Sequence, residues 1–144
     1  MLHLYYHKGG NIMNVTHGRG YVYAIQYHIV WCVKYRRKIL TEEVESKLIN
    51  ILNKIADDNQ IIIQELNTDL DHIHMLISCK PQHCISNFMK AFKGVSARLL
   101  AKEIPELKKQ FPKGHLWNPS YYIGTVSENT EQQIIDYIKS QKER

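Results

Sequence analysis

His72 and His74 are the residues whose types and spacing most directly suggest chemistry. They stand in the run Asp71-His72-Ile73-His74-Met75-Leu76, separated by one residue. Because side chains alternate between the two faces of a β-strand, both imidazoles would project from one face, about 7 Å apart. The apolar residues between and after them would take the other face and anchor the strand. Such a pair could bind one divalent cation and leave coordination positions open for a substrate.

A His-x-His pair is weak evidence when it stands alone. The simpler interpretation is two partly exposed histidines of a sheet, and two ligands are too few for a tight structural zinc site. Cys79, His83 and Cys84 follow, but their spacing matches no usual zinc-finger pattern. A metal site therefore requires a third ligand from another part of the chain.

Tyr137 and Gln141 supply a second pair of chemical groups near the end of the sequence. In a helix, residues four positions apart lie one above the other, here at the edge of an apolar stripe that contains Ile134 and Ile138. A carboxamide oxygen suits Mg²⁺ or Mn²⁺, and a phenol beside a metal-bound phosphate can act as a nucleophile. The chain has nine tyrosines, so the spacing alone also fits an ordinary surface pair.

Hydrophobic periodicity predicts the elements that would position these groups. Alternating apolar residues predict strands, and apolar residues spaced three and four apart predict helices. The expected elements are a strand at 21–33, a helix from Thr41 to about Asp58, strands at 61–66 and 70–79, a helix from about Ser86 to Pro105, a strand at 121–126 and a helix at 128–142. The order β-α-β-β-α-β-α predicts an α+β fold, a ferredoxin-like or RRM-like antiparallel sheet with an added C-terminal helix carrying Tyr137.

Local signals support the two later helices. The helix from about Ser86 would bury an apolar stripe made of Phe88, Phe92, Val95 and Leu99. Lys90 and Lys93 would lie on its opposite, basic face. Ser127 is a suitable N-cap for the last helix.

Length and composition indicate one domain with a polyanionic partner. A chain of 144 residues with 44% hydrophobic residues can bury a core of its own, which we expect at 19–144 after a loose, glycine-rich arm at 1–18. The net charge of +5 favours nucleic acid as the partner. The sequence shows no membrane-spanning run, no signal peptide and only three scattered cysteines, so we expect a cytoplasmic protein without a membrane partner.

Basic and aromatic residues alternate in two predicted loops. The run Lys34-Tyr35-Arg36-Arg37-Lys38 places cations around a tyrosine at the exit of the first strand. Phosphates and a stacked base could bind there, although a solvated basic loop has the same composition. The loop after Pro105 continues the mixture up to His115 and Trp117.

Together these residues resemble a known family, the HUH single-tyrosine transposases of the insertion-sequence 200/605 group. The resemblance extends from about Arg19 to Gln141, and residues 1–18 have no counterpart in it. It includes the hydrophobic residue between the two histidines, Ile73. The motifs that carry it are Tyr27–Arg37 (YHIVWCVKYRR), His72-Ile73-His74, Lys93–Arg98 (KGVSAR), Leu116–Tyr121 (LWNPSY), and Tyr137 with Gln141.

The resemblance implies a homodimeric enzyme that recognises a hairpin near each end of a mobile element and cleaves and rejoins single-stranded DNA without ATP. It implies that His72, His74 and Gln141 bind a divalent metal ion, Mg²⁺ or Mn²⁺. Tyr137 would attack the phosphorus, form a 5′-phosphotyrosine and free a 3′-OH, with active sites shared between the subunits. The residues expected to bind DNA are Arg19, Lys34, Tyr35, Arg36, Arg37, Lys90, Lys93, Arg98 and Trp117.

Three alternatives stay open at the level of sequence. A non-catalytic or domesticated hairpin-binding module would use the basic loops and the RRM-like order equally well. A phosphodiesterase or nucleotide hydrolase of the histidine-triad kind would carry another histidine two positions after His74, where this chain has Leu76. The third alternative is a relative that uses the same chemistry to start plasmid replication.

Overall fold

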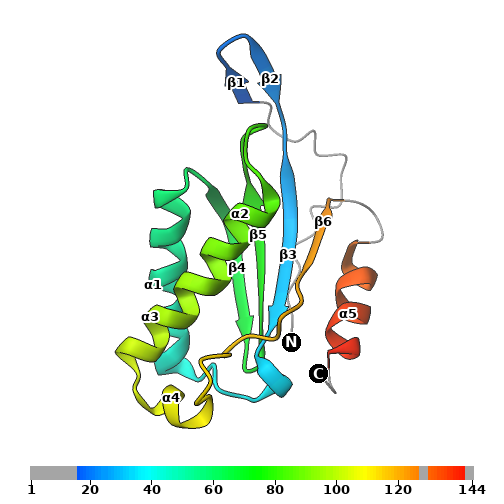
Figure 1. The fold of residues 1–144 in the computed structure, drawn as a ribbon. Helices are drawn as coiled ribbons and strands as arrows, with labels where there is room; N and C mark the ends of the chain where they lie inside the picture. Colours follow the sequence, from blue (N-terminus) through cyan, green and yellow to red (C-terminus); the bar gives the residue numbers. More distant parts are fainter. Residues whose placement is uncertain (1–15, 127–129, 142–144) are drawn as a thin grey trace.

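A four-stranded antiparallel sheet with the strand order β4-β5-β3-β6 forms the centre of the molecule (Figure 1). The computed structural model describes residues 16–126 and 130–141. The strands of this sheet are β3 (Gln26–Cys32), β4 (Ile62–Asp69), β5 (His72–Ser78) and β6 (Tyr122–Thr125). The helices are η1 (Lys34–Arg36), α1 (Glu42–Asp58), α2 (Ile85–Lys90), η2 (Ala91–Val95), α3 (Ser96–Glu103), α4 (Glu106–Gln110) and α5 (Thr130–Ser140). The predicted ferredoxin-like order with an added C-terminal helix is confirmed.

The main core lies between the sheet and the helices α1, α2 and α3. Ile29 and Trp31 of β3 and Ile73 and Met75 of β5 are fully buried on this face, because alternate residues of a strand point the same way. Leu48 of α1 is one of the helix residues that meet them. Burial of each large apolar side chain in this way contributes roughly 1.5–3 kcal/mol to the free energy of folding, so this layer packs the sheet stably against the helices.

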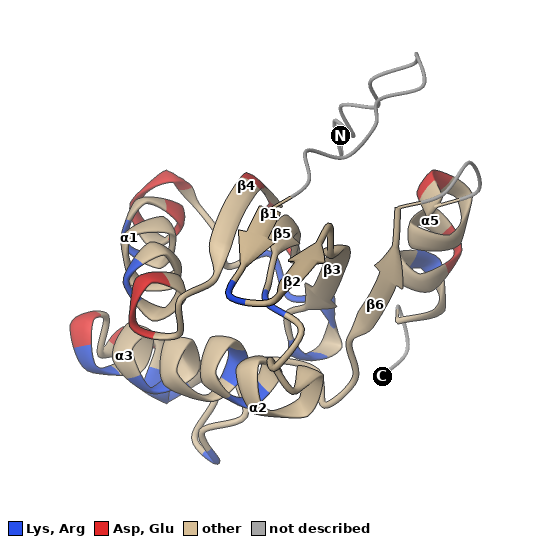
Figure 2. Cartoon of the chain, turned by 90° about the horizontal axis from the view of Figure 1, so that it is seen from above, with Lys and Arg blue, Asp and Glu red and all other residues tan. Residues whose placement is uncertain are grey.

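The last helix, α5, lies against the other face of the sheet. It contacts β3 and β6, and Figure 2 shows it beside β6, away from α2 and α3. Its buried Ile134, together with Val30 and Cys32 of β3, lies outside the main core cluster. Both faces of β3 are therefore covered, which explains why the strictly alternating pattern expected for this strand is replaced by continuous burial from His28 to Cys32.

The first predicted strand is in fact two strands. Residues 24 and 25 separate β3 from β2 (Tyr21–Tyr23), which pairs with β1 (Thr16–Gly18) in a separate two-stranded ribbon. The described end of the predicted arm, 16–18, is thus a strand, whereas 1–15 lie outside the described residues. Gly20 at the tip of this ribbon has a φ of 82°, a conformation that glycine adopts without strain.

The β4–β5 hairpin turns three residues later than expected. The gap between the expected strands at 61–66 and 70–79 predicts a turn at 67–69, but β4 continues to Asp69. Leu70 and Asp71 make the connection. Side-chain preferences suggested the turn, whereas pairing with β5 extends the strand through these polar residues. As a result Asn67 and Asp69 lie directly opposite His74 and His72 in the sheet.

The helix at 85–103 contains a π turn, η2, that changes which residues face the core. Phe88 and Phe92 are buried as predicted, but after the π turn the buried residues are Ser96 and Leu100 instead of Val95 and Leu99. A π turn adds one residue to the helix, which moves the following stripe forward by one position. The sequence pattern alone does not contain this shift.

Two further predictions concern the ends of the last helix. The N-cap predicted at Ser127 lies outside the described residues, and the helix predicted to reach about Lys142 ends at Ser140, with Gln141 in a turn and Lys142 outside the described residues. Within the ranges that are described, the longest helices fall short of the length and apolarity that a bilayer crossing requires.

Candidate active site

His72 and His74 point from β5 toward the face of the sheet that α5 partly covers. Their neighbour Ile73 pairs with Trp31 in the core, so the two histidines lie on the opposite face, as predicted. They are more buried than the sequence suggested, with 4% and 0% of their surface exposed. Buried imidazoles require partners, and the structure supplies one for each ring.

Asp71 orients the ring of His72. Nδ1 of His72 donates to Oδ1 of Asp71 at 2.7 Å, and the other carboxylate oxygen accepts from Nη2 of Arg36 at 2.9 Å. A proton on Nδ1 leaves the lone pair on Nε2 free to bind a cation, which is the arrangement that carboxylate–histidine pairs give to metal ligands. Asp71 has no role assigned from the sequence, although its position beside a histidine pair is a signal for one.

His28 of β3 contacts His74 and was also missed. A hydrogen bond of 2.9 Å joins Nδ1 of His28 and Nε2 of His74, and the two rings stack with centroids 5.1 Å apart. Burial lowers the pKa of His28. Burial, followed by the charges of His28 and His72, lowers the pKa of His74 to about 3. His74 is therefore neutral at physiological pH, the state in which an imidazole binds a metal.

Two buried nitrogen atoms of this pair, Nε2 of His72 and Nδ1 of His74, find no hydrogen-bond partner among the residues that the structure describes. An unpartnered polar atom in a buried position costs roughly 1–3 kcal/mol, and a bound divalent cation would satisfy both. Within the described ranges, His, Cys, Asp and Glu side chains form no cluster of three or more that could hold a metal. A third protein ligand from the described part of the chain would thus be a side chain of another type, such as an amide.

Tyr137 and Gln141 contact the same short segment, the connection that leads into β6. The phenol Oη of Tyr137 donates to Oγ of Ser120 at 3.1 Å. The buried Gln141 accepts, through Oε1, a hydrogen bond from Nδ2 of Asn118. Tyr137 lies in α5, whereas Gln141 follows the last residue of that helix in a turn, so the expected helical pair becomes two side chains that contact one segment. Ser120 and Asn118 stand in the LWNPSY motif, but their roles could not be assigned from it.

Arg36 links the two halves of the site. Its guanidinium pairs with Asp71, and its Nη1 donates to the carbonyl oxygen of Ile138 at 3.4 Å, one residue after Tyr137. We expected Arg36 to bind DNA, and the structure instead engages its guanidinium within the protein. Both Tyr35 and Arg36 in η1 have positive φ values, 58° and 50°, and the Tyr35 side chain is exposed whereas that of Arg36 is half-buried.

The exposed residues among those expected to bind DNA are Arg19, Tyr35, Arg37, Lys90 and Arg98. Tyr35 is 58% exposed, with Nζ of the half-buried Lys34 5.2 Å from its ring centre and the Arg37 guanidinium 5.5 Å away. An aromatic ring between cations is a suitable surface for a base and its phosphates. These residues agree with the expectation in their exposure.

Trp117 and Lys93 do not fit that expectation. Trp117 is buried in the core, where Nε1 donates to Oγ of Ser96 at 2.9 Å, so its ring cannot stack on a base without leaving the core. The ammonium of Lys93 donates to the carbonyl oxygens of Asn118 and Ser120. Burial lowers the pKa of Lys93 to about 8, against an opposing contribution from Cys32.

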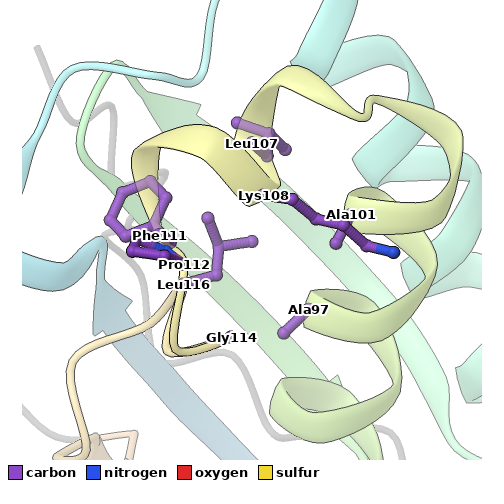
Figure 3. A pocket seen from close by; sticks show the side chains of 8 residues that line it. All are labelled: Ala97, Ala101, Leu107, Lys108, Phe111, Pro112, Gly114 and Leu116. Carbon is purple, nitrogen blue, oxygen red and sulfur yellow. The ribbon is translucent and has the colours of Figure 1, made fainter.

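A separate apolar pocket of about 180 Å³ lies between α3, α4 and the loop that follows (Figure 3). Ala97, Leu107, Phe111 and Leu116 are among its lining residues, with Lys108 at its border. Several of these residues belong to the core on the face of the sheet that α1, α2 and α3 cover, so the pocket is not part of the histidine site.

Comparison with known proteins identifies relatives over nearly the whole chain. The family model described as "Transposase IS200 like" matches residues 21–141. The ISDra2 transposase TnpA of Deinococcus radiodurans is 47% identical over 132 residues, which are 92% of this chain and 94% of that protein. The transposase of insertion sequence element IS200 from Salmonella typhimurium is 35% identical over 134 residues, 93% of this chain and 86% of that one.

Solved structures agree with this assignment. The crystal structure of a Deinococcus radiodurans R1 protein, described as a transposase, superposes with a TM-score of 0.85 at 44% identity and covers 90% of this chain and 99% of its own. A REP-associated tyrosine transposase bound to a REP hairpin superposes with a TM-score of 0.55 at 13% identity, over 88% of this chain and 74% of that chain, and so shares the fold. Taken with the family match over 21–141, these likenesses show that the chain belongs to the IS200-like transposases, of the IS200/605 TnpA type.

Proposed function

We propose that this transposase cleaves and rejoins single-stranded DNA through a covalent bond between phosphorus and Tyr137, in a reaction that depends on a divalent metal ion. The observation that carries the proposal is the pair of unpartnered imidazole nitrogens on His72 and His74, on the face of the sheet against which α5 packs. Arg36 joins the aspartate beside these histidines to the backbone next to Tyr137. The two histidines and the phenol are thus held on one side of the molecule, which supports a shared site.

The residues of the chain divide the work of the reaction. His72 and His74, together with Gln141 once its oxygen exchanges Asn118 for the ion, would hold Mg²⁺ or Mn²⁺. Such an ion supplies charge stabilisation to the phosphoryl group in the transition state. Asp71 keeps His72 in the tautomer that leaves Nε2 free, and burial keeps His74 neutral. These features fit a metal site that is assembled before the substrate binds.

Tyr137 supplies the nucleophile. A free tyrosine has a pKa near 10, so the phenolic proton must leave as the oxygen attacks phosphorus. In the structure the phenolic O–H donates a hydrogen bond to Oγ of Ser120. A bond forms between the phenolic oxygen and phosphorus while the bond from phosphorus to the 3′-oxygen breaks, and that oxygen takes up a proton. The products are a 5′-phosphotyrosine and a 3′-OH. Attack by a 3′-OH reverses the step and restores the tyrosine, so rejoining needs no ATP.

DNA hairpins near the element ends are the proposed recognition target. The solved neighbour that shares the fold is bound to a REP hairpin, which supports the same class of ligand here. The net charge of +5 and the exposed Arg37, Lys90 and Arg98 provide contacts to phosphates.

Gel analysis of a covalent product tests this function. Protein, Mg²⁺ and single-stranded element ends should give a DNA-linked band on a denaturing gel, and EDTA should remove it. His72→Ala and His74→Ala should lose the band while keeping the far-UV circular dichroism of the folded protein. Hairpin binding without any covalent product would identify a non-catalytic binding module instead. A product that persists in EDTA would remove the metal from the proposal.

The proposal includes a homodimer in which Tyr137 of one subunit serves His72 and His74 of the other. In the single chain α5 rests on its own β3 and β6, so this arrangement requires the partner's helix to take the equivalent position. Such a dimer would bring two DNA ends together, as strand exchange requires, and could cover an exposed sheet edge such as β4.

Complementation tests the shared site. A Tyr137→Phe subunit and a His72→Ala subunit are each expected to be inactive, and their mixture should regain cleavage because one site per heterodimer is intact. Heterodimers that form but remain inactive would show that each site is built within one chain.

A further inference from the structure

The connection between Trp117 and Tyr122 leaves the sheet and returns to it. Trp117 bridges Val33, and the amide of Asn118 donates to the carbonyl oxygen of Cys32 at 2.9 Å. The regular ladder begins again where Tyr122 pairs with Val30. Between these points the segment holds two residues more than the facing part of β3, so it must bulge away from it.

Lys93 binds the carbonyl groups of this bulge. Its Nζ donates to the oxygen of Asn118 at 2.7 Å and to the oxygen of Ser120 at 2.9 Å. The two carbonyls lie on either side of Pro119, which has no N–H to pair with β3. One ammonium therefore binds the backbone on both sides of Pro119, where the segment departs from the regular ladder.

The π turn provides a second link to the same segment. Oγ of Ser96 donates to the carbonyl oxygen of Lys93 and accepts from the indole N–H of Trp117 at 2.9 Å. Lys93 is thus anchored to the residue that precedes the bulge as well as to the bulge itself. π turns often occur at functional positions, because the added residue re-aims the side chains beside it.

The bulge carries the residues that meet the end of α5. Ser120 accepts the hydrogen bond of the Tyr137 phenol, and the side-chain amide of Asn118 donates to Gln141. The backbone carbonyls of these two residues are the ones that Lys93 holds. Ser120 alone therefore links the Lys93 ammonium to Tyr137, and Asn118 alone links it to Gln141.

We propose that Lys93 is a positioning residue for the reaction: it fixes the 118–120 bulge from the helix side so that Ser120 and Asn118 hold Tyr137 and Gln141 in place. The inference rests on the proposed function and assigns Lys93 a role different from phosphate binding. Lys102, an exposed lysine of α3, serves as the matched control.

Single-turnover kinetics with saturating hairpin DNA separate the two roles. Lys93→Met should lower the rate of covalent product formation by about 100-fold, the scale expected from a misplaced reacting group, while hairpin affinity and its salt dependence stay within about twofold. Lys90→Met should weaken binding and reduce its salt dependence, whereas Lys102→Met should leave the rate at saturation unchanged. Lys93→Arg, which keeps the donors, should recover part of the rate.

A structural readout and a double mutant complete the test. In ¹⁵N spectra, the side-chain amides of Asn118 and Gln141 should shift in Lys93→Met and not in Lys102→Met, with the thermal unfolding transition still cooperative. Lys93→Met and Ser120→Ala should be non-additive in rate, because both act through the same contact to Tyr137.

The contradicting outcomes are distinct. If wild-type protein forms covalent product and Lys93→Met forms it equally fast, this inference is overturned and the proposed function stands. If Lys93→Met instead loses affinity with a reduced salt slope, Lys93 is a phosphate contact. If the wild-type protein forms no covalent product at all, the proposed function fails, and the inference fails with it.

Discussion

The two halves of the candidate site are built in different ways. The histidine half stands on a central strand, where ladder pairing with β3 and β4 on both sides fixes the direction of His72 and His74. The tyrosine half stands on a terminal helix, and its orientation depends on side-chain contacts to a bulge next to an edge strand. Backbone pairing thus fixes the two histidines, whereas the phenol of Tyr137 is held by individual side-chain contacts.

Removing the nucleophile should have the largest effect. Tyr137→Phe should abolish the covalent product and leave hairpin binding nearly unchanged, because the phenolic oxygen forms the bond and exposed cations provide the affinity. Denaturing gels and a binding titration measure both quantities. Tyr122→Phe is the matched control, because it removes a hydroxyl from a neighbouring ring whose centre lies 5.9 Å from that of Tyr137. Covalent product from Tyr137→Phe would move the nucleophile to another tyrosine, with Tyr122 examined first.

Weakening the support of the histidine half should have an intermediate effect. Asp71→Asn removes the charge that orients His72 and pairs with Arg36, so metal affinity should fall by about 10- to 100-fold. Titration of Mn²⁺ against cleavage rate measures this change. Asp58→Asn, at an exposed pair with Lys54, should have no measurable effect. An unchanged metal requirement in Asp71→Asn would show that the ladder alone positions His72.

Cations outside both halves should affect binding and not chemistry. The affinity for hairpins should fall with salt, with log K decreasing by about 0.7 to 0.9 per phosphate contact against log salt. Charge removal at Lys34, Arg37 or Lys90 should each reduce that slope by about 1 at constant single-turnover rate. A slope that does not depend on these residues would place the hairpin on another surface.

The smallest expected effect is on stability. The folded-state pKa of Lys93 is about 8, below its ordinary 10.5, so between these values the unfolded chain holds more protons and stability rises with pH. Cys32 acts in the opposite direction, because burial raises its pKa from 9.0 to about 11 and stability is lost as pH rises through that window. Urea unfolding of wild type and Lys93→Met isolates the lysine: the difference in free energy of unfolding should shift in favour of wild type from pH 8 to pH 10. A constant difference would contradict this.

The fold and the histidine half could be predicted because regular periodicity encodes them. Helix α1 begins after Thr41 and ends at Asp58 as expected, and the period of two placed His72 and His74 on one face. His28 and Asp71 could not be assigned, since their roles depend on which strands become neighbours. The burial of Trp117 and the contacts of Lys93 depend on a π turn and a bulge, each of which breaks the regular period.

The extra length of the segment before β6 also implies a conflict between stability and activity. If Pro119 and Ser120 were deleted, the chain could continue the ladder from Trp117 directly into β6, and the sheet would gain regular pairing along its edge. The shortened protein would lack the hydroxyl that meets Tyr137 and the carbonyl groups that occupy Lys93. Under the proposed function, the two extra residues of this segment would therefore serve the reaction at the expense of a regular sheet edge.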